Sequence, residues 1–389
     1  DSAGSGVLVP LIEVDAGGDL TVNASGNYYL GDINAVTLGT LRLNDDISIN
    51  IDAGAEFGLD MILEGSGSID FNAGAGSQLI LTNAGGHDGT IRFNGSGDQV
   101  RLTEIASTGY GTLEMNSTGA NTLFYNPGAG TGAAAGIVIF NQVGTIDHAA
   151  TTNRLQGVGT IVANAAVTVD LSKGYPDDGA PAEERRFLVN NGTAEALQGS
   201  ANINVVGTTT NLSNGTTITL NEFEVGSTGQ PGTVVVDSYS GTLSTSNYVN
   251  VEIRHHMPNA KFVINDKAAL DMGHQALVST HSLQFGEIEV NSGGTLNVGF
   301  TQQSSGGVAG NHVAKLTLTA EGTRDGDLTL NDGATLNLQI NRTATETVFD
   351  TIQADGDVKL DGILNVLVNS LASSGGSATT PYGGNYTPT

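Results

Sequence analysis

The sequence has no cysteine and no tryptophan, and only 14 of its 389 residues are lysine or arginine. Without cysteine, the chain can form no disulfide bond, no thiolate metal site and no cysteine nucleophile. Binding to nucleic acid or to an anionic membrane surface needs a basic face, whereas the formal net charge is -26. The only lysine or arginine residues among the first 150 are Arg42, Arg92 and Arg101. We therefore expect neither of these two partners.

Long apolar runs are also missing, since none approaches the roughly 18 residues of a membrane span. Glycine is plentiful instead, with 55 residues, about twice the average share of roughly 7%. Charged residues make up 14% and hydrophobic residues 38%, so the composition is not that of a charge-expanded disordered chain. Short clusters of Val, Ile, Leu and Phe alternate with Gly, Asn, Ser, Thr and Asp, which indicates many short strands and turns.

An internal repeat organises the chain. One pattern returns at residues 49–55, 69–75, 91–95 and 113–117, with spacings of 20, 22 and 22 along the sequence. In the second half, residues 287–298 match 327–338 at an offset of 40, which we interpret as two turns of 20. The segment 261–270 fits the same pattern and begins 26 residues before segment 287–298. A unit of this length cannot bury its own apolar face, but stacked units form parallel sheets around a continuous core.

The predicted fold is therefore all-β: a parallel β-solenoid, or β-helix, with coils of about 20–25 residues, one surface insertion and an extended C-terminal tail. The expected segments are N-terminal strands or a cap over 1–47, a regular solenoid over 48–170, an insertion over 171–188, a less regular solenoid over 189–368 and the tail over 369–389.

Strand alternation predicts which side chains point inward and which point outward. Eight residues are expected to stack in the core: Ile69, Phe71, Leu79, Leu81, Ile91, Phe93, Leu113 and Met115. An asparagine or aspartate follows the inward-facing residue in most repeats, and stacked asparagines could hydrogen-bond as a ladder at about 4.8 Å per coil. The alternative is that these residues merely favour turns. The positions are Asp52, Asn72, Asn94, Asn116, Asn141, Asn221, Asn265, Asn291, Asn331 and Asp361.

Two segments carry a family resemblance. Residues 326–338, Gly-Asp-Leu-Thr-Leu-Asn-Asp-Gly-Ala-Thr-Leu-Asn-Leu, and residues 349–360 resemble the autotransporter-associated β-strand repeats of large secreted bacterial surface proteins. The resemblance implies a β-solenoid that is secreted and lies outside the cell or at the cell surface. It implies no catalytic residue.

Catalysis on polysaccharides is a further alternative, because it needs clustered carboxylates. The pairs Asp45-Asp46 and Asp177-Asp178 are adjacent in sequence, so on a strand their side chains point to opposite faces. Sugar-binding clefts usually offer aromatic platforms, and the acidic chain would repel a polyanionic substrate. We expect no catalytic residue.

Metal binding has two candidates. The pair His255-His256 lacks the further ligands of a zinc site, and we expect it to be solvated. The turns Asp325-Gly326-Asp327 and Asp355-Gly356-Asp357 offer carboxylates for a structural Ca²⁺, or are solvated turns. No other cofactor is predicted.

The sequence favours a structural subunit of an extracellular bacterial fibre, sheath or surface layer, with copies of itself as partners. One alternative is an adhesin stalk that binds a host surface or glycan through residues 173–187, and another is a polysaccharide-active enzyme. Exposed sheet edges template further strand pairing, by stacking or strand addition. We expect residues 7–14 or the tail 370–389 to pack on an adjacent copy. The candidate interface residues are Val7, Val9, Ile12, Val14, Tyr382 and Tyr386.

Overall fold

The computed structural model describes residues 11–14, 21–24, 26–31, 39–82, 87–103, 111–126, 136–148, 155–172, 186–189, 196–207, 221–226, 238–272, 280–298, 313–342, 347–370 and 382–386. All regular elements in these ranges are strands, β1 to β36. No helix in this part of the chain is long and apolar enough to cross a membrane. The chain forms two compact units, Asp1–Leu197 and Gln198–Thr389, which are described separately.

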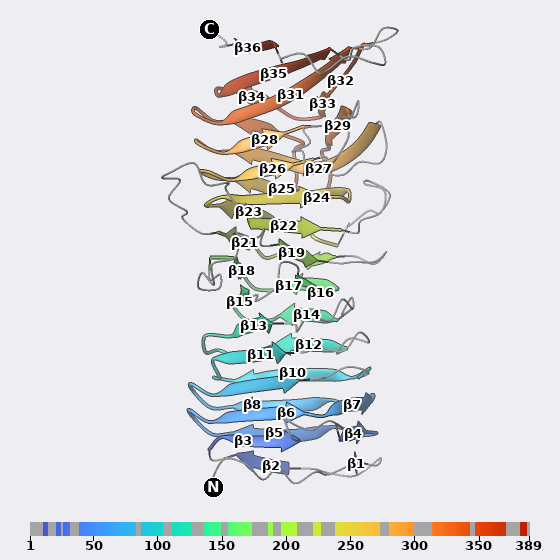
Figure 1. Cartoon of the computed structure of the whole chain (residues 1–389), viewed down its shortest axis with the longest axis vertical. Helices are drawn as coiled ribbons and strands as arrows, with labels where there is room; N and C mark the ends of the chain where they lie inside the picture. Colours follow the sequence, from blue (N-terminus) through green and yellow to red (C-terminus); the bar gives the residue numbers. More distant parts are fainter. Residues whose placement is uncertain are drawn as a thin grey trace. The chain divides into compact units, whose positions relative to one another are not determined.

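The first unit is a stack of coils whose strands pair in parallel with those of the next coil (Figure 1). One face contains β1 (Leu11–Val14), β4 (Thr40–Leu43) and β7 (Ile62–Gly65). The second contains β2 (Thr21–Ala24), β5 (Ile47–Ile51), β8 (Ile69–Ala73), β10 (Thr90–Gly95), β12 (Thr112–Met115), β14 (Ile137–Phe140) and β17 (Thr160–Ala163). The third contains β3 (Tyr28–Gly31), β6 (Glu56–Asp60), β9 (Gln78–Thr82), β11 (Gln99–Thr103), β13 (Thr122–Asn126), β15 (Gly144–His148) and β18 (Val167–Asp170). A further pair joins β16 (Leu155–Val158) to β19 (Arg186–Val189).

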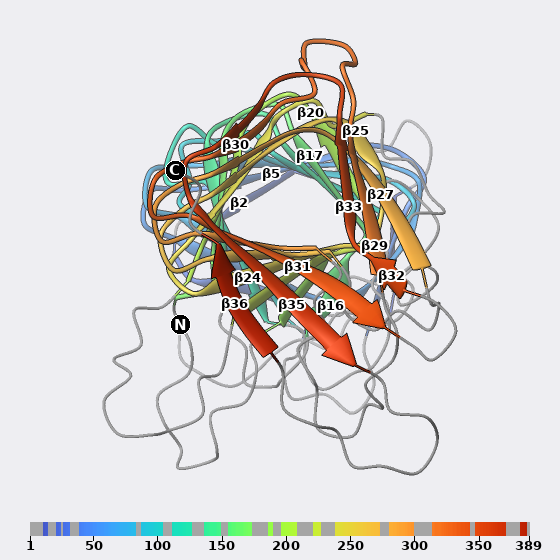
Figure 2. The same ribbon diagram turned by 90° about the horizontal axis from the view of Figure 1, so that it is seen from above.

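The second unit repeats this plan on two sheets, whose strands lie on different sides of the coil (Figure 2). One sheet holds β21 (Ile203–Val206), β23 (Thr242–Ser246), β25 (Met257–Ile264), β27 (Thr280–Val290), β29 (Val313–Leu318), β30 (Leu328–Leu330), β33 (Thr351–Ala354) and β34 (Val358–Leu360). The other holds β22 (Asn221–Val225), β24 (Val249–Ile253), β26 (Ala269–Asp271), β28 (Thr295–Asn297), β31 (Thr335–Arg342) and β35 (Ile363–Ser370). Two short strands, β32 (Thr347–Phe349) and β36 (Tyr382–Tyr386), pair antiparallel with β31 and β35. Strand β20 (Leu197–Gly199) spans the boundary between the units.

The predicted parallel β-solenoid is thus confirmed, but one interval in the first unit is wrong. Ile47 pairs with Ile69, Ile69 with Ile91, and Ile91 with Leu113, so the spacing from each of these coils to the next is the same, 22. The sequence comparison placed the first interval at 20 because it aligned Ala-Gly-Ala at 53–55 with the same triplet at 73–75. The first triplet begins in a turn, whereas Ala73 of the second ends β8, where the strand register places it opposite Ile51.

The coils of the second unit differ more in length. Phe262 pairs with Ile288, Ile288 with Leu328, and Leu328 with Val358, at separations of 26, 40 and 30 along the chain. The offset between segments 287–298 and 327–338 is therefore one coil, and its interpretation as two turns is wrong. Strand pairing fixes which residues meet, while the connection between strands can vary in length without changing the register, so an offset alone does not count coils.

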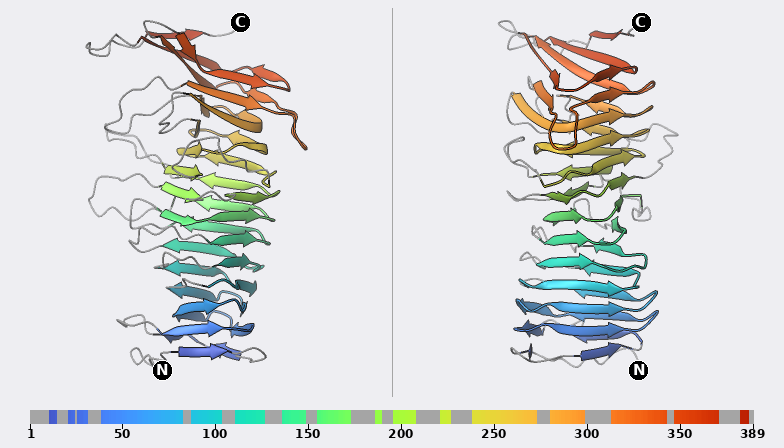
Figure 3. Two further views of the ribbon diagram at one scale, coloured as in Figure 1. Left: turned by 90° about the vertical axis from the view of Figure 1, so that its right-hand side faces the viewer. Right: turned by 180° about the vertical axis from the view of Figure 1, so that it is seen from behind.

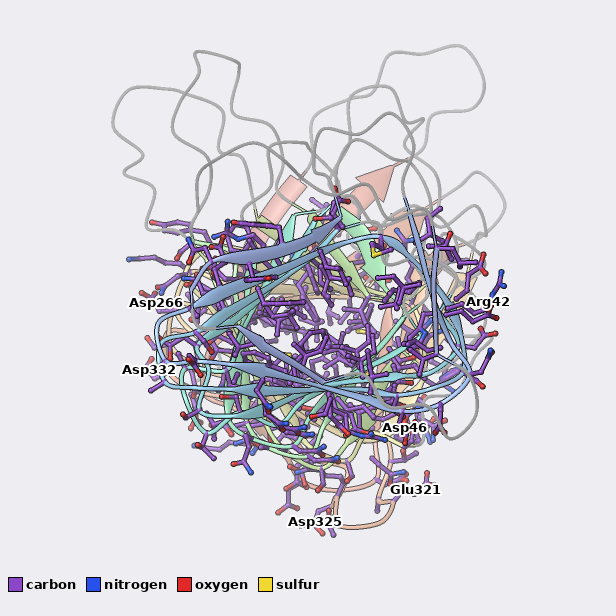
Figure 4. All side chains as sticks on the ribbon, turned by 90° about the horizontal axis from the view of Figure 1, so that it is seen from below. Arg42, Asp46, Asp266, Glu321, Asp325 and Asp332 are labelled. Atoms are coloured by element: carbon purple, nitrogen blue, oxygen red, sulfur yellow. The ribbon has the colours of Figure 1, made fainter. Side chains whose placement is uncertain are left out.

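The core follows the predicted alternation. All eight residues expected inside the first unit are 0% exposed. Aromatic side chains pack across coils, with the ring centroids of Phe57 and Phe71 5.8 Å apart. Figure 4 shows side chains filling the interior of the coils, whereas Arg42 and Asp46 lie on the outside. Because the same register positions are apolar in successive coils, the buried layer is continuous through each unit.

The predicted insertion over 171–188 begins and ends inside the solenoid. Leu171 is 0% exposed and Phe187, on β19, is 1% exposed, so both belong to the core. Residues 173–185, which include Asp177-Asp178 and most of the candidate binding segment, lie outside the described residues.

The described part of the tail, β36, pairs within its own chain. Strand β36 pairs with β35 of its own chain, placing Tyr382 opposite Val368 and Tyr386 opposite Leu364. One edge of the tail strand is therefore occupied within the chain, and packing of the tail on an adjacent copy stays a prediction. Because β36 runs antiparallel to β35, it also interrupts the parallel progression of that sheet.

Candidate functional sites on the outer surface

Outward-facing asparagines form the predicted ladder in the first unit. Each side-chain amide donates to the amide oxygen of the residue one coil earlier, as from Asn72 to Asn50 at 3.0 Å. Asn94 departs from this pattern and donates to Asp70 at 3.3 Å. The remaining bonds run from Asn116 to Asn94 at 3.0 Å, from Asn141 to Asn116 at 2.8 Å and from Asn164 to Asn141 at 2.8 Å.

One predicted ladder position is wrong. In the first coil the ladder residue is Asn50 and not Asp52, because the true interval is 22 and not 20. Asn221 begins β22, where its backbone partner in the next coil is Val249, and its side chain lies outside the described residues. In the second unit the ladder is confirmed: Asn291 donates to Asn265 at 3.0 Å, and Asn331 donates to Asn291 at 2.8 Å.

A second ladder, which sequence reasoning missed, runs along the other sheet of the second unit. The Asn297 amide donates to the Asp271 carboxylate, Asn337 donates to Asn297 at 2.6 Å, and Asn365 donates to Asn337 at 3.0 Å. Asp271 and Asn297 are 2% and 8% exposed, so these bonds satisfy polar groups that are shielded from water. The recurring asparagine between two aliphatic residues, as at 296–298 and 336–338, could have revealed it.

Charged side chains of the first unit also pair between coils. Arg42 lies between Glu13, at 3.5 Å, and Glu64, at 2.8 Å. The hydrogen bond and charge of Glu64, with the charge of Glu13, raise the pKa of the Arg42 guanidinium. Arg92 lies in the same way at 3.4 Å from both Asp70 and Glu114.

Arg101 contacts an aromatic ring of the next coil. Its guanidinium carbon lies 5.1 Å from the ring centroid of Phe124, a cation–π distance. Arg42, Arg92 and Arg101 therefore all contact side chains of neighbouring coils.

In the second unit, an arginine in the loop 319–327 also contacts neighbouring coils, and its partners lie much earlier in the sequence. Figure 3 shows this loop, orange in the right-hand view, running alongside earlier coils of the unit. Arg324 donates to the backbone carbonyls of Ser240 at 2.7 Å, Gly241 at 3.0 Å and Asn259 at 3.0 Å. Its side chain is 14% exposed, so the arginine joins successive coils and does not offer a free cation.

The Asp45-Asp46 pair, weighed above for catalysis, has structural contacts, whereas Asp177-Asp178 lies outside the described residues. Asp46 accepts the backbone N–H of Ser68 in the next coil at 2.7 Å, and Asp45 accepts the N–H of Asp46 at 2.8 Å. Both therefore order a turn.

The two Asp-Gly-Asp turns stack in consecutive coils of the second unit. Asp327 accepts the backbone N–H of Asp357 at 2.7 Å, and Asp355 accepts that of Ala320 at 3.3 Å. Within the described ranges, no group of three or more His, Cys, Asp or Glu side chains is placed to hold a metal ion. One carboxylate of each turn, Asp327 and Asp355, thus bonds to a backbone amide of the adjacent coil, and a structural Ca²⁺ there stays a prediction.

The histidine pair corrects the expectation of a solvated site. His255 is 2% exposed, and neither of its ring nitrogens has a hydrogen-bond partner. Burial, with the charges of Arg254 and His256, lowers the pKa of His255 to about 4. The pair follows β24, which ends at Ile253.

This burial predicts a loss of stability in acid. Unfolded histidine has a pKa near 6.5, so the unfolded chain binds more protons than the folded one between about pH 6.5 and pH 4. The stability contributed by neutral His255 is complete above pH 6.5 and is lost as the pH falls towards 4, by up to about 3 kcal/mol. Urea unfolding at both pH values checks this: His255→Leu should lose less stability on acidification than the wild type. Equal losses would contradict it.

Asp350 was also missed from the sequence. Its carboxylate oxygens accept the backbone N–H groups of Ala314 at 2.9 Å and Gln339 at 2.6 Å, and the residue is 6% exposed. Burial raises the pKa of Asp350 to about 7, although the two N–H bonds act in the opposite direction. The residue joins three segments of the second unit.

The predicted interface residues fall in different places. Val7 and Val9 lie outside the described residues. Ile12 and Val14 are on β1, where Ile12 is half-buried and Val14 is 7% exposed, against its own coil. Tyr382 and Tyr386 are on β36. A contact of these residues with a second copy stays a prediction.

The chain was compared with protein-family models, with curated proteins and with solved structures. No family model matches the chain, and no match is found among curated proteins or among solved structures.

Proposed function

We propose that the chain is a structural β-solenoid: a subunit of an extracellular bacterial fibre, sheath or surface layer that assembles from copies of itself. The proposal includes no catalytic role and no cofactor. The secreted location rests on the resemblance of residues 326–338 and 349–360 to autotransporter-associated β-strand repeats.

One observation carries the structural role: outward-facing polar side chains bond to the same register positions of neighbouring coils. Asn116 both donates to Asn94 and accepts from Asn141. Arg42 lies between two glutamates of adjacent coils. In enzymes, polar and charged groups usually converge on a cleft with perturbed pKa values. Here these groups bond each coil to the next. Such bonds stabilise the stack of coils, as a structural subunit requires.

The strongly acidic composition supports an assembly that depends on ionic strength. With 40 acidic against 14 basic residues, two copies repel each other until ions screen the charge. The screening length is about 30 Å at 0.01 M ionic strength and about 8 Å at 0.15 M.

We therefore expect self-association to increase with salt or divalent cations. Sedimentation velocity of the purified chain should show monomers at low ionic strength, and larger species at physiological ionic strength or with added calcium chloride. Larger species at equal abundance under all conditions would contradict the electrostatic part of the proposal. Monomers under all conditions would contradict the proposed function itself.

A further inference from the structure

The coil formed by β33, β34 and β35 leaves core positions open. Val358 and Leu360 on β34 are in register with Leu328 and Leu330 on β30. The two residues on β30 are each 1% exposed, because β34 lies on them, whereas Val358 is 53% exposed and Leu360 is 40% exposed. The same apolar register positions are thus buried in one coil and exposed to water in the next.

The strands of this coil differ in whether their second backbone edge is paired. On one face, β36 covers the edge of β35 that β31 does not use. On the other face, the described residues contain no strand that pairs with the second edge of β34, whose only partner there is β30. An unpaired edge beside exposed apolar side chains is a surface on which another strand can add.

The first unit presents the opposite edge. Strand β3 pairs with β6, placing Tyr28 opposite Phe57 and Leu30 opposite Leu59. Phe57 is 0% exposed, but Tyr28 at the matching inward position is 55% exposed. Within the described part of the chain β3 pairs with no other strand. Among the described residues, the second unit therefore has an open edge on β34, on the side away from its preceding coil, and the first unit has one on β3, on the side away from its following coil.

The two edges match in sequence as well as in direction. In a parallel pairing with Tyr28 beside Val358, Leu30 falls beside Leu360, and Tyr29 falls beside Lys359. Lys359 is one of only 14 basic residues, and its side chain is 57% exposed. The Tyr29 hydroxyl donates to Glu56, so this pairing brings a cation to a ring and a carboxylate. A Lys–Tyr contact of this kind already occurs within the chain, where the Lys267 ammonium lies 5.6 Å from the Tyr248 ring centroid.

We propose that β34 of one chain binds β3 of a second copy in parallel, head to tail, with Val358 and Leu360 packing on Tyr28 and Leu30. The inference rests on the proposed function and names the faces that assemble. A heterologous contact of this kind repeats from copy to copy, and it gives a filament when the rotation between copies does not close into a ring. The contact also gives copies of an acidic chain one strand register in which apolar side chains and a lysine offset their mutual repulsion.

Two complementary variants test the contact. Val358→Asp places a charge on the β34 face and leaves β3 intact, and Tyr28→Asp does the reverse. Each variant alone should remain monomeric in sedimentation velocity at the ionic strength where the wild type assembles. An equimolar mixture should form a one-to-one dimer and nothing larger, because only one intact face of each chain can pair. Circular dichroism establishes that both variants are folded.

Val143→Asp is the matched control, since it adds the same charge at an apolar position that is 68% exposed and far in sequence from both strands. It should assemble as the wild type does. If either face variant alone still polymerises, or the mixture yields no dimer while the wild type assembles, the contact is wrong and the proposed function stands. Dimers of Tyr28→Asp alone would indicate pairing between two β34 faces and would overturn the inference. A wild type that never assembles would overturn both.

Discussion

Replacing Phe93 by alanine should lower the free energy of unfolding of the first unit by about 3–5 kcal/mol. Phe93 is 0% exposed, and its strand pairs on one side with Phe71 and on the other with Met115. The substitution therefore opens a cavity in the middle of a stack, where neither neighbouring coil can move in without breaking its own strand register.

The measurement is urea unfolding followed by far-UV circular dichroism, because the chain has no tryptophan for fluorescence. Phe349→Ala is the control, since Phe349 is 57% exposed and its loss should change stability by no more than about 1 kcal/mol. Equal effects of the two substitutions would show that Phe93 does not lie in a packed core.

Replacing Gly65 by alanine should destabilise the same unit by about 2–5 kcal/mol. Gly65 has a φ of 93°, which costs a residue with a side chain about 1–2 kcal/mol. A Cβ at this position would also lie 2.1 Å from the carbonyl oxygen of Leu43 in the preceding coil. Since that atom is backbone, the two paired strands must separate, at a further cost of about 1–3 kcal/mol.

Gly54→Ala separates these two effects. Gly54 has a φ of 72°, but a Cβ there would meet no atom within 4 Å. We expect it to cost only the backbone term, about 1–2 kcal/mol. The same urea series compares the two variants, and a Gly65→Ala variant as stable as Gly54→Ala would mean that the coils are not in close contact at this corner.

The sequence predicted the parts of the fold that depend on local alternation. Ile91 and Phe93 point inward because they are two positions apart on one strand, and that spacing is visible without a structure. The asparagine ladder was predictable for the same reason. The errors arise where turns resemble one another: the Ala-Gly-Ala triplets at 53–55 and 73–75 led to Asp52 in place of Asn50.

Contacts between distant segments could not be predicted. Arg324 bonds to Ser240, far earlier in the chain, through a loop whose sequence carries no alternation. Strand β36, Tyr-Gly-Gly-Asn-Tyr, has no apolar pattern, and its pairing is set by β35. His255 is buried in a connection, whereas the absence of further zinc ligands in the sequence had indicated a solvated pair. Each of these positions depends on which coil lies next to which, and the sequence offers no direct measure of that.

Electron microscopy of the purified full chain tests the central claim, that this β-solenoid builds an extracellular assembly, most directly. At physiological ionic strength with calcium, we expect filaments or sheets with one repeating subunit contact, which disperse at low ionic strength. A field of separate particles under both conditions, from protein whose circular dichroism shows folded β-structure, would contradict the claim.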